Sequence, residues 1–362
     1  MTAPMPPHTD RVDPPLAGPT APIASPIVSL DALVAAVLAT GRPLRVAVAP
    51  CAEAFVLQAA AQAHARGLAD PICIGNAART LEKARQLGID PATLTIVPEP
   101  DDAAAVQRAV DFFRAGEADL IMKGLVSTST LLKAILNKDT GVPPQDGILS
   151  HVTVFDAPLP LAASDASPGS PPDAPSDAPP PAPRLMLLTD AGVNIRPTLQ
   201  RKAEIVKNAV DVARRLGIAA PRVAMLAATE KVNYPAMPAT LDADMIAKMA
   251  DQGAFGDVRV AGPMALDMAV SPQAAALKGA TGPDAVGAVA EVAGHADILC
   301  APDIESANIL YKALGTLLRT PLASVVVGSR VPVVVPSRAD SGRSKFLSIA
   351  LAAWLARTPS AP

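Results

Sequence analysis

Short apolar runs alternate with longer helix-like segments along this chain from about residue 45 onward. The run 45–50 (RVAVAP) predicts a strand, and residues 52–66 predict a helix that ends at Gly67. Repeated strand–helix–strand units of this length predict parallel sheets with helices on both faces, and ligands that lie beyond the carboxyl ends of the strands. Further strands are expected at 71–75, 93–97, 118–122, 222–227, 258–262, 297–302, 324–328 and 331–335. A further helix is expected to follow the strand 71–75 and to end at residue 87, and others are expected at 102–115, 129–137, 198–216, 237–252, 305–318 and 344–356.

Composition narrows the class of protein. Half of the 362 residues are hydrophobic but only 2% are aromatic, so Ala, Val, Leu and Ile must build the core of about two domains. The formal net charge of −3 gives no reason to expect nucleic-acid binding. No stretch approaches the roughly 18 apolar residues of a membrane span, and the N-terminal region lacks the apolar segment of a secretory signal. Cys51, Cys73 and Cys300 are widely spaced, which favours reduced thiols in a cytoplasmic protein.

Two segments are rich in proline and show no periodic pattern. Residues 1–26 contain eight prolines, and residues 157–183 contain ten, so both are expected to be disordered. The flanks of the second segment, HVTVFDAP and PRLMLLTDAG, both predict strands. The segment is therefore interpreted as a hairpin loop lengthened by insertion, and not as a domain boundary.

A polar turn, residues 337–342, links the apolar strand 331–335 to the C-terminal helix. Strand, turn and helix in this order place free backbone N–H groups at the strand's carboxyl end, which is a natural anion site. Arg338 adds a planar guanidinium suited to two phosphate oxygens. The residues alone thus predict a phosphate-like ligand in an α/β protein.

Two other polar turns follow predicted strands. In the turn that begins at Lys123, Gly124 allows close backbone approach, and Ser127 and Thr128 stand where a helix N-terminus takes a cap or an anion. A plain capping role for Ser127 is slightly favoured over ligand binding. In the turn 189–194, Asp190 and Asn194 are candidates for ligand contact, although Asp and Asn also favour turns for their own sake.

Several familiar site patterns are absent from the sequence. There is no GxxxxGK[ST], no GxGxxG after a strand, no GxSxG and no HExxH. The four histidines, at positions 8, 64, 151 and 295, have no ligand spacing and no nearby Ser or Cys partner. We therefore expect no metal site and no acyl-enzyme nucleophile, and we assign no catalytic role to any histidine.

Five blocks of the sequence together resemble one protein family. They are KGLVSTSTLLKAIL, TDAGVNIRPTLQRKAEIVKNAVDVARRLGI, GPMALDMAVSPQAAALKG, PDIESANILYK and SRADSGRSKFLSIALA. In this order, from about Arg45 to the C-terminal helix, they resemble the phosphate acetyltransferase/phosphate butyryltransferase family. The Pro-rich tail and the Pro-rich insertion are departures from the family pattern.

The resemblance implies an architecture. It is a two-domain α/β protein, similar to isocitrate and isopropylmalate dehydrogenases, in which parallel sheets flank an interdomain cleft. Residues 43–149 and 301–357 would form the first domain, and residues 150–300, with the Pro-rich loop, would form a second domain inserted into it. The resemblance also implies a homodimer that binds coenzyme A (CoA), acyl phosphate and phosphate as substrates, with no tightly bound cofactor and no metal.

The resemblance also implies roles for residues. Ser337 and Arg338 would donate to the acyl and phosphoryl oxygens, and Asp340 would steer or deprotonate the CoA thiol, which with a pKa of about 8.5 is only about 3% thiolate at pH 7. The catalytic aspartate of the acetyl branch falls several residues beyond the Ser-Arg pair, where this chain has Ser344, so the identity of the base stays open. Substrate contacts are expected from Lys123, Gly124, Ser127, Thr128, Lys133, Asp190, Asn194, Asn308, Lys312 and Ser341.

The implied reaction is acetyl-CoA + phosphate ⇌ acetyl phosphate + CoA. A phosphate butyryltransferase is the first alternative, because both branches share the SRADS turn. A non-catalytic acyl-CoA sensor is the second, since related domains are regulatory modules of malic enzymes. A metal-dependent decarboxylating dehydrogenase would need clustered Asp ligands and a nicotinamide site, and the sequence shows neither.

Overall fold

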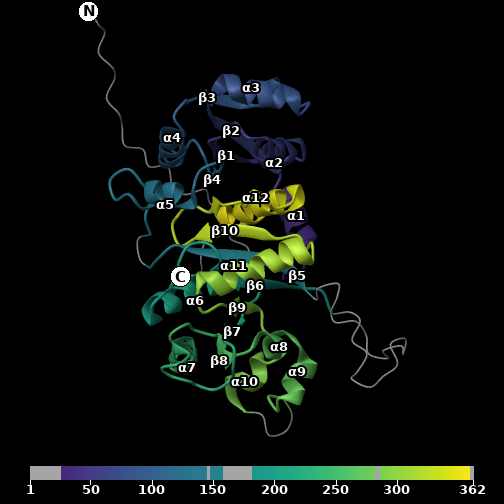
Figure 1. Cartoon of the computed structure of the whole chain (residues 1–362). Helices are drawn as coiled ribbons and strands as arrows, with labels where there is room; N and C mark the ends of the chain where they lie inside the picture. Colours follow the sequence, from purple (N-terminus) through teal and green to yellow (C-terminus); the bar gives the residue numbers. More distant parts are fainter. Residues whose placement is uncertain (1–25, 145–146, 158–181, 282–285, 359–362) are drawn as a thin grey trace, which may run out of the picture.

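A computed structural model describes residues 26–144, 147–157, 182–281 and 286–358. The strands of these residues form one sheet in the order β3-β2-β1-β4-β11-β10-β5-β6-β9-β7-β8 (Figure 1). The predicted tail and most of the Pro-rich loop fall outside the described residues. The strands are β1 (Leu44–Ala49), β2 (Ala69–Gly75), β3 (Thr95–Pro98), β4 (Leu120–Lys123), β5 (Ser150–Ala157), β6 (Arg184–Thr189), β7 (Arg222–Leu226), β8 (Arg259–Met264), β9 (Ile298–Cys300), β10 (Ala323–Val327) and β11 (Val333–Val334).

Helices follow most strands, as the alternating pattern predicts. The helix 305–318 divides into α11 and a π-helical turn at Ala313–Leu317, and α1 is a further helix that was not predicted. The helices are α1 (Leu30–Ala39), α2 (Ala54–Ala65), α3 (Ala77–Gln86), α4 (Asp102–Arg114), α5 (Thr128–Leu136), α6 (Leu199–Arg215), α7 (Pro238–Asp251), α8 (Leu266–Val270), α9 (Pro272–Leu277), α10 (Gly287–Val292), α11 (Ile304–Lys312) and α12 (Gly342–Arg357).

The sheet is mixed, whereas the sequence predicted parallel sheets in separate domains. β5 and β6 form the predicted hairpin, and β10 pairs antiparallel with both β5 and β11. All other pairs are parallel. These three reversals at the centre join what would be two sheets into one, so the expectation of separate sheets is corrected. They also make β6 run opposite to β4 and β11.

The hydrophobic core differs between the two faces of the sheet. On one face a single apolar cluster covers the sheet's whole width beneath helices that include α1, α2, α6, α7 and α12. On the other face one cluster lies under α4 and α5, and a separate one lies under α8 to α11. Between these two clusters the central strands carry polar side chains, since Thr153 of β5 and Ser324 of β10 share a buried hydrogen bond of 3.0 Å. The interrupted core leaves a polar strip across the middle of this face.

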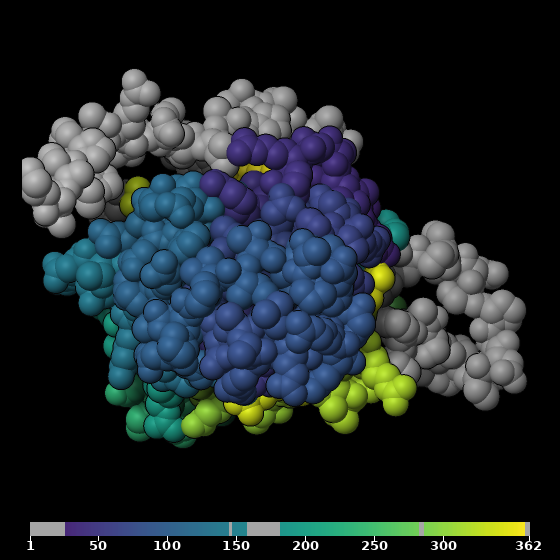
Figure 2. Space-filling model, turned by 90° about the horizontal axis from the view of Figure 1, so that it is seen from above, coloured from purple at the N-terminus to yellow at the C-terminus, as the bar shows by residue number. Residues whose placement is uncertain are grey.

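The two halves of the molecule come from different parts of the sequence. Figure 2 shows that N-terminal residues, coloured purple to blue, form one end of the molecule. The green second half forms the other end, and α12 lies between the two in Figure 1.

The two-residue β11 is shorter than the predicted strand 331–335, because Pro332 and Pro336 lack the N–H that a ladder needs. No helix in the described residues is long and apolar enough to cross a membrane.

Candidate active site

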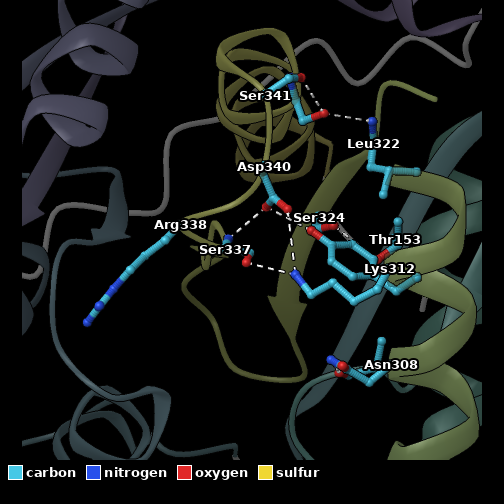
Figure 3. Close-up of polar contacts among 12 residues, drawn as sticks. Thr153, Asn308, Lys312, Leu322, Ser324, Ser337, Arg338, Asp340 and Ser341 are labelled. Carbon is cyan, nitrogen blue, oxygen red and sulfur yellow. Dashed lines mark hydrogen bonds and ion pairs between the residues drawn. The ribbon is translucent and has the colours of Figure 1, made fainter. Parts of the chain in front are cut away.

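The turn between β11 and α12 is closed by Asp340. Its Oδ2 accepts a hydrogen bond of 2.7 Å from the backbone N–H of Ser337, and its own N–H donates to the Ser337 carbonyl at 3.2 Å (Figure 3). Ser341 then caps α12, because its Oγ accepts from the N–H of Ser344 at 3.0 Å. The predicted catalytic residues Ser337, Arg338 and Asp340 thus lie on one compact turn.

Helix α11 brings two further side chains to this turn. The hydroxyl of Tyr311 donates to Asp340 Oδ2 at 2.8 Å. Lys312 Nζ donates to Ser337 Oγ at 2.8 Å (Figure 3). Lys312 Nζ also lies 4.0 Å from Asp340 Oδ1. Burial raises the pKa of Tyr311 well above its usual value, so its phenol stays a hydrogen-bond donor. Because Ser337 Oγ accepts from a lysine, its own hydrogen is free to be donated to a ligand.

Arg338 points away from this cluster, as Figure 3 shows, and its guanidinium is exposed. No described side chain or backbone group forms a hydrogen bond or ion pair with it. Lys123 lies at the end of β4, the parallel neighbour of β11, and its Nζ donates to the carbonyls of Gly124 at 3.1 Å and Val126 at 2.9 Å. Burial, together with the nearby positive charge of Arg338, lowers the pKa of Lys123. The charges of Lys123 and Arg338 therefore influence each other, and two neighbouring cations favour an anion between them.

Lys345 supports the turn from within α12. It is 3% exposed, and its Nζ donates to the backbone carbonyls of Arg338 and Asp340. The sequence analysis missed both Lys345 and Tyr311. A signal for Lys345 does exist, because it is a lone lysine at the start of an apolar run, FLSIALAAW.

The turn after β4 is built mainly for packing and capping. A Cβ at Gly124 would lie 1.7 Å from the carbonyl oxygen of Pro50, so only glycine fits there. Ser127 caps α5 by accepting from the N–H of Thr130 at 3.0 Å, which is the plain role that the sequence favoured. Thr128 begins this helix. Lys133 is exposed on it, and no described side-chain contact joins it to the other candidates.

Asp190 and Asn194 form a separate turn. The carboxylate of Asp190 accepts from three backbone N–H groups, those of residues 192, 193 and 194, and from Asn194 Nδ2 at 2.7 Å. Because β6 runs opposite to β4 and β11, its carboxyl end points in the opposite direction along the strands. The turn is nevertheless near the Ser337–Asp340 turn, because Asp190 and Asp340 both influence the pKa of His151. Asn308 of α11 contacts the same turn, because its Nδ2 donates a hydrogen bond of 3.0 Å to the carbonyl oxygen of Ala191.

His151 lies between the two turns. It is 5% exposed, and its ring meets the ring of Tyr311 edge-on at 6.0 Å between centroids. Its Nδ1 has no hydrogen-bond partner among the described residues. Burial lowers the pKa of His151 against the opposing influence of Asp190 and Asp340, while Lys312 lowers it further. His151 is thus a buried, uncharged imidazole beside the site, and the sequence analysis assigned it no role.

Neither metal nor thiol chemistry is indicated within the described part of the chain. No cluster of His, Cys, Asp and Glu there could hold a metal ion. All three cysteines are buried free thiols, and burial raises the pKa of Cys300 to about 12, so it is a poor nucleophile. An open pocket of about 230 Å³ borders the turn, with Lys312 and Asp340 among its lining residues.

Comparison with known proteins places this geometry in context. The family model of the phosphate acetyl/butaryl transferases matches residues 102–353. A phosphate butyryltransferase from Clostridium acetobutylicum is 40% identical over 86% of this chain and 93% of its own length. A phosphate acetyltransferase from Rhizobium meliloti is 36% identical over 90% of this chain and 93% of its own. Among solved structures, a branched-chain phosphotransacylase from Enterococcus faecalis V583 is similar with a TM-score of 0.68 and 30% identity, covering 88% of this chain and 100% of that one.

Proposed function

The chain belongs to the phosphate acetyl/butaryl transferase family, and from that premise we propose how its site transfers an acyl group. It is an acyltransferase that moves an acyl group reversibly between CoA and inorganic phosphate. CoA is a substrate here and not a resident cofactor. The observation that carries the residue assignment is the Ser337–Asp340 turn, in which a serine hydroxyl is held by a lysine and a carboxylate is held by a tyrosine.

The contacts of the turn suggest a role for each group. In the direction of thioester synthesis, the CoA sulfur attacks the acyl carbon of the acyl phosphate, and its proton passes to Asp340. The oxygen that becomes negative in the tetrahedral intermediate accepts from Ser337, and the Lys312 ammonium stabilises that charge. The C–O bond to the phosphoryl group then breaks, and phosphate leaves toward Arg338. No covalent acyl-enzyme is required.

The base assignment rests on the two oxygens of Asp340. Oδ2 accepts from the Ser337 N–H and the Tyr311 hydroxyl, whereas within the described part of the chain the only side-chain partner of Oδ1 is the Lys312 ammonium at 4.0 Å. Oδ1 is therefore the oxygen available to a thiol. At Ser344, the position of the acetyl-branch aspartate, the hydroxyl instead contacts Ser341 Oγ at 2.9 Å and accepts from the N–H of Leu322 at 3.1 Å. That contact network supports Asp340 and not residue 344 as the base.

For the acyl group we propose acetyl, with butyryl as the second candidate. A specific observation favours the second, because relatives at 40% and 38% identity are phosphate butyryltransferases whereas acetyltransferases stand at 36% and 35%. The ratio of kcat/KM for acetyl phosphate and butyryl phosphate separates the two.

We also propose two domains that meet at the site, divided as the resemblance implies, with residues 43–149 and 301–357 in the first and residues 150–300 in the second. The sheet order supports this, because the strands from residues 150–300 run from β5 to one edge of the sheet, and the other strands run from β10 to the opposite edge. The turn lies close to this boundary, since β10 separates β11 from β5. A cytoplasmic homodimer remains our expectation from the resemblance.

Steady-state kinetics of Ser337→Ala test the assignment. The variant loses the hydroxyl that Lys312 holds, and we expect kcat to fall at least tenfold with no change in fold by circular dichroism. A Ser337→Ala enzyme with the kcat of the parent would remove Ser337 from the chemistry.

A further inference from the structure

Lys123 differs in its surroundings from the other lysines near the turn. It ends β4, the parallel neighbour of β11, and it is half-buried. No carboxylate among the described residues forms an ion pair with it. Lys312, by contrast, lies 4.0 Å from Asp340 Oδ1, and Lys345 is only 3% exposed. Lys123 is therefore partly accessible and, within the described part of the chain, has no carboxylate partner.

Two carbonyl oxygens hold the Lys123 amino group in a fixed place. Its Nζ donates to the carbonyl of Gly124 at 3.1 Å and to that of Val126 at 2.9 Å. The backbone around these acceptors is itself held, because the Gly124 N–H donates to the Ala49 carbonyl at 2.8 Å. Gly124 also packs against Pro50 so closely that no Cβ fits between them. The nitrogen of Lys123 is thus fixed at one point near the β11–α12 turn.

This arrangement suits a neutral amine as well as an ammonium. An ammonium has three N–H groups, and the third of these has no partner among the described residues. A neutral amine has two N–H groups and one lone pair. The two carbonyls then satisfy both N–H groups, and the lone pair takes the remaining position. The hydrogen bonds of Lys123 therefore leave its nitrogen able to act as a nucleophile.

The charges near Lys123 also favour the neutral amine. Burial is the larger cause that lowers the pKa of Lys123, and the positive charge of Arg338 lowers it further. Lys278 shows the opposite case, because it pairs with Glu230 at 2.7 Å and Asp267 at 3.0 Å, and these carboxylates raise its pKa. A lysine that is desolvated and next to another cation is the usual form of a reactive amine in proteins.

The proposed reaction brings a suitable electrophile to this nitrogen. An acyl phosphate is a mixed anhydride, and its acyl carbon reacts with amines as well as with thiols. Its phosphoryl group is attracted to the neighbouring cations Lys123 and Arg338. Only one oxygen separates the phosphorus from the acyl carbon. A bound acyl phosphate therefore holds its reactive carbon close to Lys123 Nζ.

We propose that Lys123 is a site of self-acylation, at which the acyl phosphate bound by the enzyme modifies the amino group and removes a cation from the phosphate site. The neutral Nζ attacks the acyl carbon and the N–C bond forms. The C–O bond to the phosphoryl group breaks, and phosphate leaves with the proton that the amine gives up. The amide product is uncharged, so it no longer attracts an anion beside Arg338. This inference rests on the proposed function, because that function supplies the acyl phosphate.

Mass spectrometry that resolves individual lysines tests the inference on the full chain. The enzyme is incubated with acetyl phosphate in the absence of CoA, and the acyl group on each lysine is measured over time. Acylation of Lys123 should be at least about tenfold faster than that of Lys138, which follows α5, is exposed and has no side-chain partner among the described residues. Inorganic phosphate at about ten times its dissociation constant should slow acylation of Lys123 about tenfold and leave that of Lys138 unchanged.

Lys123→Arg provides a second test, because a guanidinium keeps the positive charge and stays protonated. After incubation with acetyl phosphate, a fully acylated parent should show at least about a tenfold lower kcat/KM for phosphate than before incubation. The kcat/KM of Lys123→Arg, relative to its own starting value, should stay constant. Lys138→Arg is the matched control and should lose activity as the parent does. The mass measurement on the parent decides independently of the starting activity of Lys123→Arg.

Failure of the inference can be told from failure of the proposed function. A folded parent that forms no thioester from CoA and acyl phosphate would refute the function, and the inference with it. In an active parent, acylation of Lys123 no faster than that of Lys138 would overturn the inference alone. Acylation of Lys123 that phosphate does not slow would also overturn it, because the donor would then react from solution. An equal loss of activity in Lys123→Arg would overturn it too, since another residue would be the one modified.

Discussion

Removal of the Arg338 guanidinium tests the proposed phosphate side of the site. The side chain is exposed and has no hydrogen bond or ion pair within the described residues, so Arg338→Ala should change the free energy of unfolding by no more than about 0.5 kcal/mol. If the guanidinium binds a phosphate, its loss removes a charge-assisted contact that contributes about 1.5–3 kcal/mol. That corresponds to a roughly ten- to hundredfold fall in kcat/KM for phosphate.

The assay is acyl phosphate synthesis from acetyl-CoA at varied phosphate concentration, with the melting temperature measured on the same samples. Arg338→Lys keeps the charge but loses the planar two-point contact, so its loss should be intermediate. Arg330→Ala is the matched control, because Arg330 is also exposed but follows β10. β10 runs antiparallel to β11, so its carboxyl end points away from the turn. Unchanged kinetics of a folded Arg338→Ala enzyme would refute the reasoning, as would an equal loss in Arg330→Ala.

Three further predictions concern other parts of the chain. Tyr311→Phe removes one of the two hydrogen bonds to Asp340 Oδ2, so kcat should fall about tenfold while the KM for phosphate stays the same. A change in the KM for phosphate alone would contradict the positioning role of Tyr311. Burial lowers the pKa of His151, so below about pH 6.5 the unfolded chain takes up the proton first and the fold loses stability. The drop in melting temperature from pH 7.5 to 5.5 should therefore be smaller in His151→Phe, and an equal drop would exclude this cause. Replacing residues 158–183 by a short turn should leave turnover largely intact, and loss of activity in a folded variant would assign the segment a role in the site or in assembly.

Much of the fold follows from local pattern. The apolar runs gave the strands within a few residues, and the two strands flanking the Pro-rich segment pair as the predicted hairpin. The union of the strands into one sheet was not predictable in this way, because strand order and direction depend on pairing between distant residues. The antiparallel pairs of β10 with β5 and β11 determine it, and nothing local in SVVVG indicates them.

The same distinction holds for the candidate site. Ser337, Arg338 and Asp340 share one turn, and the resemblance pointed to Lys312, which the structure brings to Ser337. Tyr311 was missed because in NILYK it reads as an apolar helix residue, and only the approach of α11 to the turn pairs it with Asp340. Asp190 and Asn194 were expected to contact substrate because their turn follows a predicted strand. The β5–β6 hairpin turns the carboxyl end of β6 away from that of β11, but α11 contacts both turns, through Asn308 and Lys312.

The polar residues of buried strands offer a signal that was available but not used. His151 and Thr153 stand at alternate positions of the buried strand β5, and both face the interrupted side of the core. Such residues need a polar environment, so they indicate where the core is interrupted. The resemblance to the family is confirmed by the family model and by relatives over most of the chain.

The most direct test of the account is thioester formation from CoA with acetyl, propionyl and butyryl phosphate, run without added metal on the parent enzyme and on Ser337→Ala. The account predicts turnover by the parent with at least one of these acyl phosphates, and at least a tenfold lower kcat in the variant. A folded parent enzyme that binds CoA but forms no thioester would contradict the proposed function, and equal turnover by the variant would contradict the placement of the chemistry at this turn.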